Sequence, residues 1–176
     1  MRSRPDPTEY APFYAGYISR VPEGGILEIL ERQPADIRRA LATVTPDRET
    51  FRYAPEKWSI REVLGHIGDA ERIFGYRALC IGRGDRTPFP GFDEKPYVAA
   101  SGAGQRALAD LADEFAAVRA ANLIVLRHLA EAAWLNMGTA SNNPVSVRAV
   151  VYTMAGHVLH HMAVLRERYG VGAADR

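Results

Sequence analysis

Histidines are the residues of this chain whose type and spacing could do chemistry. His157 and His161 are four positions apart, so on a helix both rings project from one face, about 40° from each other. At this spacing one helix can give two ligands to a single transition metal. His160 points about 100° away from His161. We expect it to be exposed; the alternative is that it supports a metal ligand or faces the substrate. The spacing therefore predicts a pair made of His157 and His161.

A third histidine, His66, lies on a separate predicted helix, at the edge of its apolar face. Three histidines from two facing helices would form a half-shell around a divalent metal, with open positions for water or substrate. The alternative is that they are core or rim histidines satisfied by other side chains. Glu62 and Asp69 flank His66. Either could accept its second N–H, although both could equally be solvated surface acids.

The other reactive residues give no competing site. The sequence has no Ser/His/Asp or Cys/His arrangement, which fits chemistry that needs no side-chain nucleophile. Tyr152, Glu62 and Asp69 are the candidate general bases. His128 has no suitable partner four positions away and is interpreted as a surface residue. Cys80, the single cysteine, excludes an internal disulfide and is interpreted as a packing residue.

Four helices are predicted to position these residues, over positions 25–44, 59–82, 105–133 and 145–169. Pro34 should kink or interrupt the first helix. Ser59 and Glu62 form a capping-box pattern at the start of the second. The third carries an apolar seam interrupted by Asn122, which is either a buried polar residue that gives specificity or a cavity-lining one.

The last helix is expected to start at Asn143-Pro144 or at Ser146, and to stop at Gly170. No window shows the sustained alternation of a strand. The predicted fold is therefore all-α, a four-helix bundle formed by a single domain over residues 1–176.

Two segments outside the helices have distinctive composition. Residues 83–104 form a long connection, which can cross the whole bundle and so leave helices two and three parallel. Residues 1–20 carry several prolines, which exclude regular helix, and aromatic residues that suggest an arm packed on the body.

Composition excludes several functional classes. Lys and Arg total 22 against 21 Asp and Glu, and the basic residues alternate with acidic ones, so a dedicated nucleic-acid role is not expected. No stretch approaches the ~20 apolar residues of a membrane span, and no signal peptide is visible. We expect a soluble, cytoplasmic protein.

Two motifs resemble those of a known family. Residues 54–72, with Trp58-Ser59 and a helix carrying His66-x-x-Asp69, resemble the second-helix signature of the DinB/YfiT-like superfamily. Residues 155–166 are similar to that family's last-helix His-x-x-x-His. The resemblance covers roughly residues 18–170.

This resemblance implies an up-down-down-up four-helix bundle. It also implies a divalent metal, most often nickel or zinc, held by His66, His157 and His161. Understood members resemble metal-dependent transferases that use low-molecular-weight thiols such as bacillithiol or mycothiol, and others are called hydrolases. The expected partners are a small-molecule substrate and, as in many members, a second copy of the chain in a homodimer. A non-catalytic metal- or ligand-binding stress-response module and a structural dimeric bundle are the alternatives.

Overall fold

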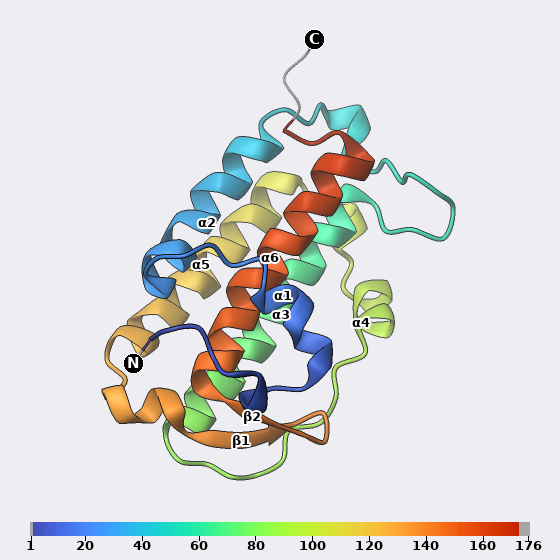
Figure 1. The fold of residues 1–176 in the computed structure, drawn as a ribbon. Helices are drawn as coiled ribbons and strands as arrows, with labels where there is room; N and C mark the ends of the chain where they lie inside the picture. The colour runs from blue at the N-terminus through green and yellow to red at the C-terminus, as the bar shows by residue number, and fades with distance from the viewer. Residues whose placement is uncertain (1, 173–176) are drawn as a thin grey trace.

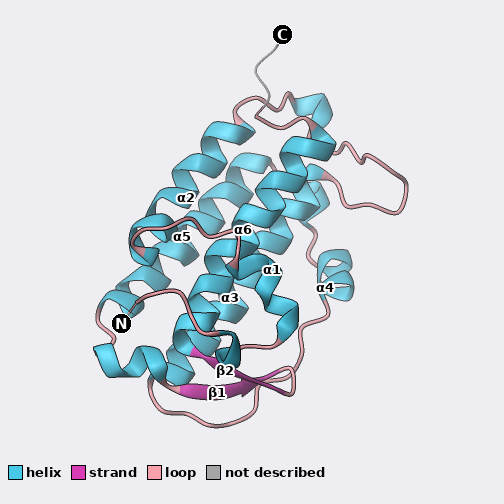
Figure 2. Ribbon diagram, in the orientation of Figure 1, coloured by secondary structure: helices cyan, strands magenta, loops and turns pink. Residues whose placement is uncertain are grey.

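The computed structural model describes residues 2–172, and nearly all of its regular structure is helical (Figures 1 and 2). The helices are α1 (Ala15–Ile18), α2 (Ile26–Leu41), α3 (Ile60–Gly82), α4 (Glu94–Ala100), α5 (Leu108–Arg127) and α6 (Val147–Tyr169). Short 3₁₀ turns lie at Pro7–Glu9, Pro12–Tyr14, Pro46–Arg48, Ala103–Gln105 and Glu131–Leu135. The strands are β1 (Met137–Ala140) and β2 (Asn143–Ser146).

The four long helices of the described chain form the bundle, in which α2 and α3 each pack against both α5 and α6. Side-chain contacts give their directions. Near the start of α3, Trp58 meets Tyr169 at the end of α6, so these two helices are antiparallel. Along α3 and α5, Arg72 pairs with Glu114 at 2.8 Å, and Gly82 lies against Leu129, so these two run parallel.

The other pairs complete the topology. Arg38 near the end of α2 pairs with Asp113 near the start of α5, at 2.6 Å, whereas Arg127 at the end of α5 pairs with Glu31, so α2 and α5 are antiparallel. Helices α2 and α6 are parallel. The predicted up-down-down-up four-helix bundle is confirmed.

The segment between α3 and α5 makes the crossover that this topology needs. It leaves the lower end of α3, passes the β-hairpin, and climbs the outer side of the bundle to the start of α5 (Figure 2). It contains the short helix α4, in which Val98 is buried, and the 3₁₀ turn that buries Ala103 against Gly65 of α3. The crossover is thus ordered against α3.

A buried polar layer divides the core into two apolar clusters. Arg119 on α5 is fully buried and donates two hydrogen bonds, both of 2.8 Å, to the carboxylate of Glu71 on α3. It also donates to Gln33 on α2, whose amide donates to the carbonyl of Ala155 on α6. Asn122 donates to Glu71 as well, which assigns it to a buried polar contact. This network ties all four bundle helices together at one level.

Pro34 does not interrupt its helix, so of the two expected effects only the kink stays a prediction. Helix α2 runs through Pro34, although a proline cannot donate to the carbonyl four residues earlier, that of Leu30. Arg119 supplies the missing donor, because its Nη1 lies 2.9 Å from the Leu30 oxygen. The polar layer thereby accommodates the proline.

The N-terminal segment lies against α6. Arg4 donates to the carbonyls of Ile18 and Val21, and Glu9 forms an ion pair with Arg148 on α6. The prolines do not exclude helix throughout, because α1 forms directly after Pro12–Tyr14.

Two other local expectations are corrected, and one choice between alternatives is settled. An antiparallel hairpin follows α5, in which Ser141 and Asn142 both have positive φ, as a type I′ two-residue turn requires. Its strands are too short to show alternation. Helix α5 ends at Arg127, because the following turn redirects the chain to bury Trp134 in the core. Of the two predicted start signals of the last helix, Ser146 is the one that caps α6, whereas Asn143 and Pro144 belong to β2.

No helix among residues 2–172 is both long enough and apolar enough to cross a membrane.

Candidate metal site

The start of α3 fixes the first predicted ligand. Ser59 caps the helix, and Glu62 completes the capping box by accepting from the Ser59 backbone N–H at 2.7 Å. His66 follows one turn later on the face that packs against α6. Its ring contacts Trp58, with ring centroids 4.9 Å apart, and lies nearly parallel to Phe92 of the crossover.

Helix α6 brings the other two histidines to the same point. The Nε2 atoms of His66 and His157 are 3.0 Å apart, and those of His157 and His161 are 3.1 Å apart. One ligand nitrogen from each ring lies within 4.8 Å of the other two. His66 and His157 are each only 6 % exposed, and His161 is half-buried. The three residues predicted from sequence therefore converge.

Burial keeps this cluster neutral. It lowers the pKa of His66 to about 4, and lowers the pKa values of His157 and His161 well below their usual range. Neighbouring histidines act in the same direction on His157 and His161, because two imidazolium charges at this separation repel. Neutral imidazoles are the form that binds metals.

The rings fit a metal better than they fit one another. A single Nε2 of His157 faces two other Nε2 atoms, and no carboxylate reaches any of the three among the described residues. A divalent ion would satisfy all three lone pairs at once, with Zn–N distances of about 2.0–2.1 Å. Three protein ligands also leave a coordination position open.

A cleft of about 430 Å³ opens onto the three histidines. Tyr17 of α1 forms one wall, with its ring 5.5 Å from that of His157 and 5.4 Å from that of His160. This approach depends on Gly156, because a Cβ there would lie 2.0 Å from the Tyr17 carbonyl oxygen. The other lining residues include Trp58, Phe74, Phe92, Arg77, Glu94, Ser141 and Asn143. The site is thus an aromatic-walled cleft.

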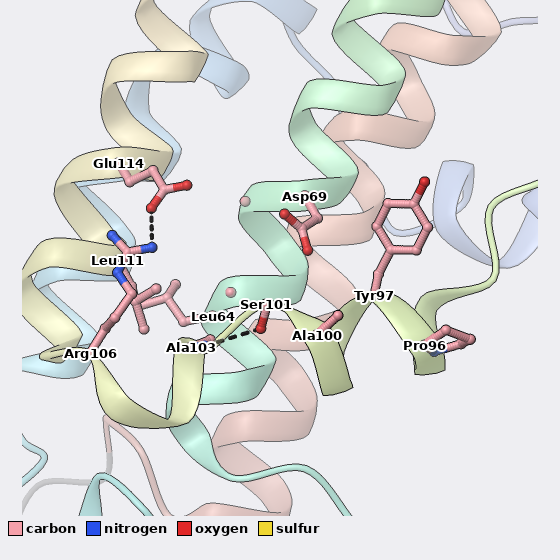
Figure 3. A pocket seen from close by; sticks show the side chains of 12 residues that line it. Leu64, Asp69, Pro96, Tyr97, Ala100, Ser101, Ala103, Arg106, Leu111 and Glu114 are labelled. Atoms are coloured by element: carbon pink, nitrogen blue, oxygen red, sulfur yellow. Dashed lines mark hydrogen bonds and ion pairs between the residues drawn. The ribbon is translucent and has the colours of Figure 1, made fainter.

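The two acids expected to orient His66 do not do so. Glu62 is engaged by Ser59 and by Arg52. Asp69, three residues after His66, points into a separate cavity of about 490 Å³ beneath the crossover, where it faces Tyr97 (Figure 3). Nδ1 of His66 is buried without a hydrogen-bond partner in residues 2–172.

Of the other residues considered from the sequence, His160 lines the cleft, and Tyr152, His128 and Cys80 lie outside it. His160 is half-buried and lines the cleft, so the expectation of an exposed role is wrong and the alternative is favoured. Tyr152 lies outside the cleft, where its hydroxyl donates to the Arg2 carbonyl. His128 is exposed, and Cys80 packs half-buried against the core.

The sequence reading missed Arg77, Glu94 and Tyr17 as cleft residues. A signal existed for Arg77, because positions 66, 70, 74 and 77 follow the i, i+4, i+8, i+11 spacing of one helix face. Glu94 and Tyr17 come from the crossover and the N-terminal segment, whose placement has no periodic signal.

Comparisons with known proteins agree with this architecture. The family model of the DinB superfamily matches residues 29–165. A solved structure described as YfiT from Bacillus subtilis, "a probable metal-dependent hydrolase with an unusual four-helix bundle topology", has a TM-score of 0.75 and 18% sequence identity. The match covers 93% of this chain and 95% of that one. No curated protein matches the sequence. Because the family model spans most of the bundle, including all three histidines, the chain belongs to the DinB superfamily.

Proposed function

We propose that this protein is a metal-dependent enzyme whose nickel or zinc ion is held by His66, His157 and His161. Its reaction is either the transfer of a low-molecular-weight thiol to a small-molecule substrate or the hydrolysis of a small-molecule substrate. The observation that carries this proposal is the convergence of three neutral imidazoles at the base of an open cleft. We further propose that it works in the cytoplasm as a homodimer.

The chemistry of the cleft supports an enzyme that needs no side-chain nucleophile. Cys80 lies outside the cleft, and Ser141 makes no hydrogen bond with a histidine among the described residues. When bound, a divalent ion lowers the pKa of a water or thiol that it coordinates.

The chain's own residues would hold and shield the reactants. His66, His157 and His161 offer neutral nitrogen lone pairs, and the rings of Trp58 and Tyr17 restrict water around them. Glu94 places a carboxylate on the wall of the same cleft, where it can accept a proton.

Activity assays on the metal-loaded protein test the proposal. One panel of activated esters tests hydrolysis, and an aryl halide with a low-molecular-weight thiol tests thiol transfer. We expect turnover by the wild type and by His128→Ala, which removes an exposed histidine, and loss of turnover in His66→Ala. Equal rates in His66→Ala and the wild type, with the helical content unchanged, would contradict the catalytic role. A metal-loaded wild type without turnover in either panel would favour the non-catalytic binding module.

A further inference from the structure

Arg77 is a buried arginine that has no carboxylate partner in the described part of the chain. Its side chain is on α3, and the residue is only 4% exposed. Nη2 donates to the carbonyl of Pro90 at 2.7 Å, and the guanidinium carbon lies 5.9 Å from the centre of the Phe74 ring. Arg77 forms no other hydrogen bond and no ion pair among residues 2–172, and its remaining N–H groups reach the solvent of the cavities that it lines.

The second buried arginine of the bundle shows what a structural role requires here. Arg119 donates two hydrogen bonds to Glu71, one to Gln33 and one to a backbone carbonyl. A buried charge is costly unless it is paired and hydrogen-bonded. Arg119 meets this condition within the fold, whereas Arg77 does not.

The position of Arg77 shows where its missing partner belongs. Arg77 lines the same cleft as His66 and His157, and also a neighbouring cavity of about 320 Å³. Phe74, which lies within ring-contact distance of both Arg77 and His157, lines the histidine cleft and not the neighbouring cavity. At 1.5 Å per residue, the Cα atoms of His66 and Arg77 are about 16 Å apart along α3, a gap that their side chains shorten. A molecule reaching both must be elongated.

We propose that Arg77 is the anion-binding group of this cleft, and that the substrate is a small acid whose carboxylate or phosphate pairs with Arg77 while its other end lies at the three histidines. Guanidinium forms paired, charge-assisted hydrogen bonds with either kind of oxyanion. Glu94 lies on the wall of the same cleft but forms no ion pair with Arg77 among residues 2–172, so the guanidinium is available to an oxyanion. The role of the histidine end rests on the proposed function, whereas anion binding by Arg77 does not.

Stability measurements separate a ligand-binding role from a structural one. Removing an unpaired buried charge in Arg77→Met should leave the thermal unfolding midpoint unchanged or raise it, because the exposed Pro90 carbonyl can be hydrated. Removing the paired charge in Arg119→Met should lower it by roughly 10 °C. A comparable drop in Arg77→Met would identify Arg77 as a structural residue and overturn the proposal.

Calorimetric titration of the metal-free protein with succinate and with inorganic phosphate tests anion binding directly. We expect the wild type to bind at least one of these anions, and Arg77→Gln to bind it about tenfold to a hundredfold more weakly. Arg83→Gln removes the same charge from an exposed position next to the end of α3 and should retain wild-type affinity. Equal binding by Arg77→Gln and the wild type, or no binding of either anion by the wild type, would overturn the proposal.

Metal content measured on the same variants as purified, before the metal is removed for calorimetry, distinguishes this inference from the proposed function. Anion binding that depends on Arg77 in a protein without metal affinity would refute the metal site alone. If the protein carries stoichiometric metal, but the wild type and Arg77→Gln bind the anion equally well, only the proposed substrate class is refuted.

Discussion

Acidification should destabilise the metal-free protein well before its carboxylates titrate, because His66 is neutral in the fold. Burial lowers the pKa of His66 from 6.5 to about 4, so below pH 6.5 the unfolded chain binds a proton that the folded chain does not. The free energy of unfolding is therefore not reduced by His66 above pH 6.5, and it decreases as the pH falls from 6.5 toward 4.

The expected size follows from the two pKa values. Between pH 7.5 and pH 5, a histidine that titrates near 6.5 when unfolded and near 4 when folded removes about 2 kcal/mol from the free energy of unfolding. His157 and His161 act in the same direction. Glu9 contributes little in this window, because Arg148 holds its pKa at about 2 and the loss begins only below its unfolded value of 4.5.

Urea denaturation of the metal-free protein at several pH values between 7.5 and 5 measures this effect. The loss of stability across the window should be about 2 kcal/mol smaller in His66→Gln than in the wild type. His128→Gln should behave as the wild type does, since His128 is exposed. Parallel pH dependences of His66→Gln and the wild type would refute the assignment of His66 as a buried neutral group.

Two further predictions concern the elements that hold the site. Glu71→Gln leaves Arg119 without its charged partner in the buried polar layer, so we expect the free energy of unfolding to fall by about 3–5 kcal/mol in urea denaturation; a change below about 1 kcal/mol would contradict the role of the layer. Gly156→Ala places a methyl group 2.0 Å from the Tyr17 carbonyl oxygen, so α1 must move away from α6. We expect faster proteolysis within residues 2–20 and a stability loss of about 1–3 kcal/mol, and an unchanged cleavage rate would show that α1 does not depend on this close approach.

Local signals explain why the bundle and the histidines could be predicted. The Ser59 capping box at α3 is present with both of its hydrogen bonds, and Gly170, at φ 71°, follows the end of α6 as expected. The i, i+4 spacing of His157 and His161 places two rings together whenever the helix forms. The length of the connection was enough to indicate parallel packing of α3 and α5.

Features that depend on tertiary contacts could not be predicted in this way. Asp69 is three positions from His66, yet the packing of the crossover puts it in a different cavity. Glu94 reaches the cleft only because the crossover is folded against α3. The pairing of Arg119 with Glu71 joins residues 48 positions apart, and neither has a sequence signal that distinguishes it from a surface charge.

Metal analysis by inductively coupled plasma mass spectrometry, on protein purified without a histidine tag, tests the central claim most directly. We predict close to one nickel or zinc ion per chain in the wild type and in His128→Ala, and loss of that ion in His157→Ala with the helical circular dichroism retained. A wild type that takes up no stoichiometric metal, or a His157→Ala variant that keeps it, would contradict the assignment of His66, His157 and His161 as a metal site.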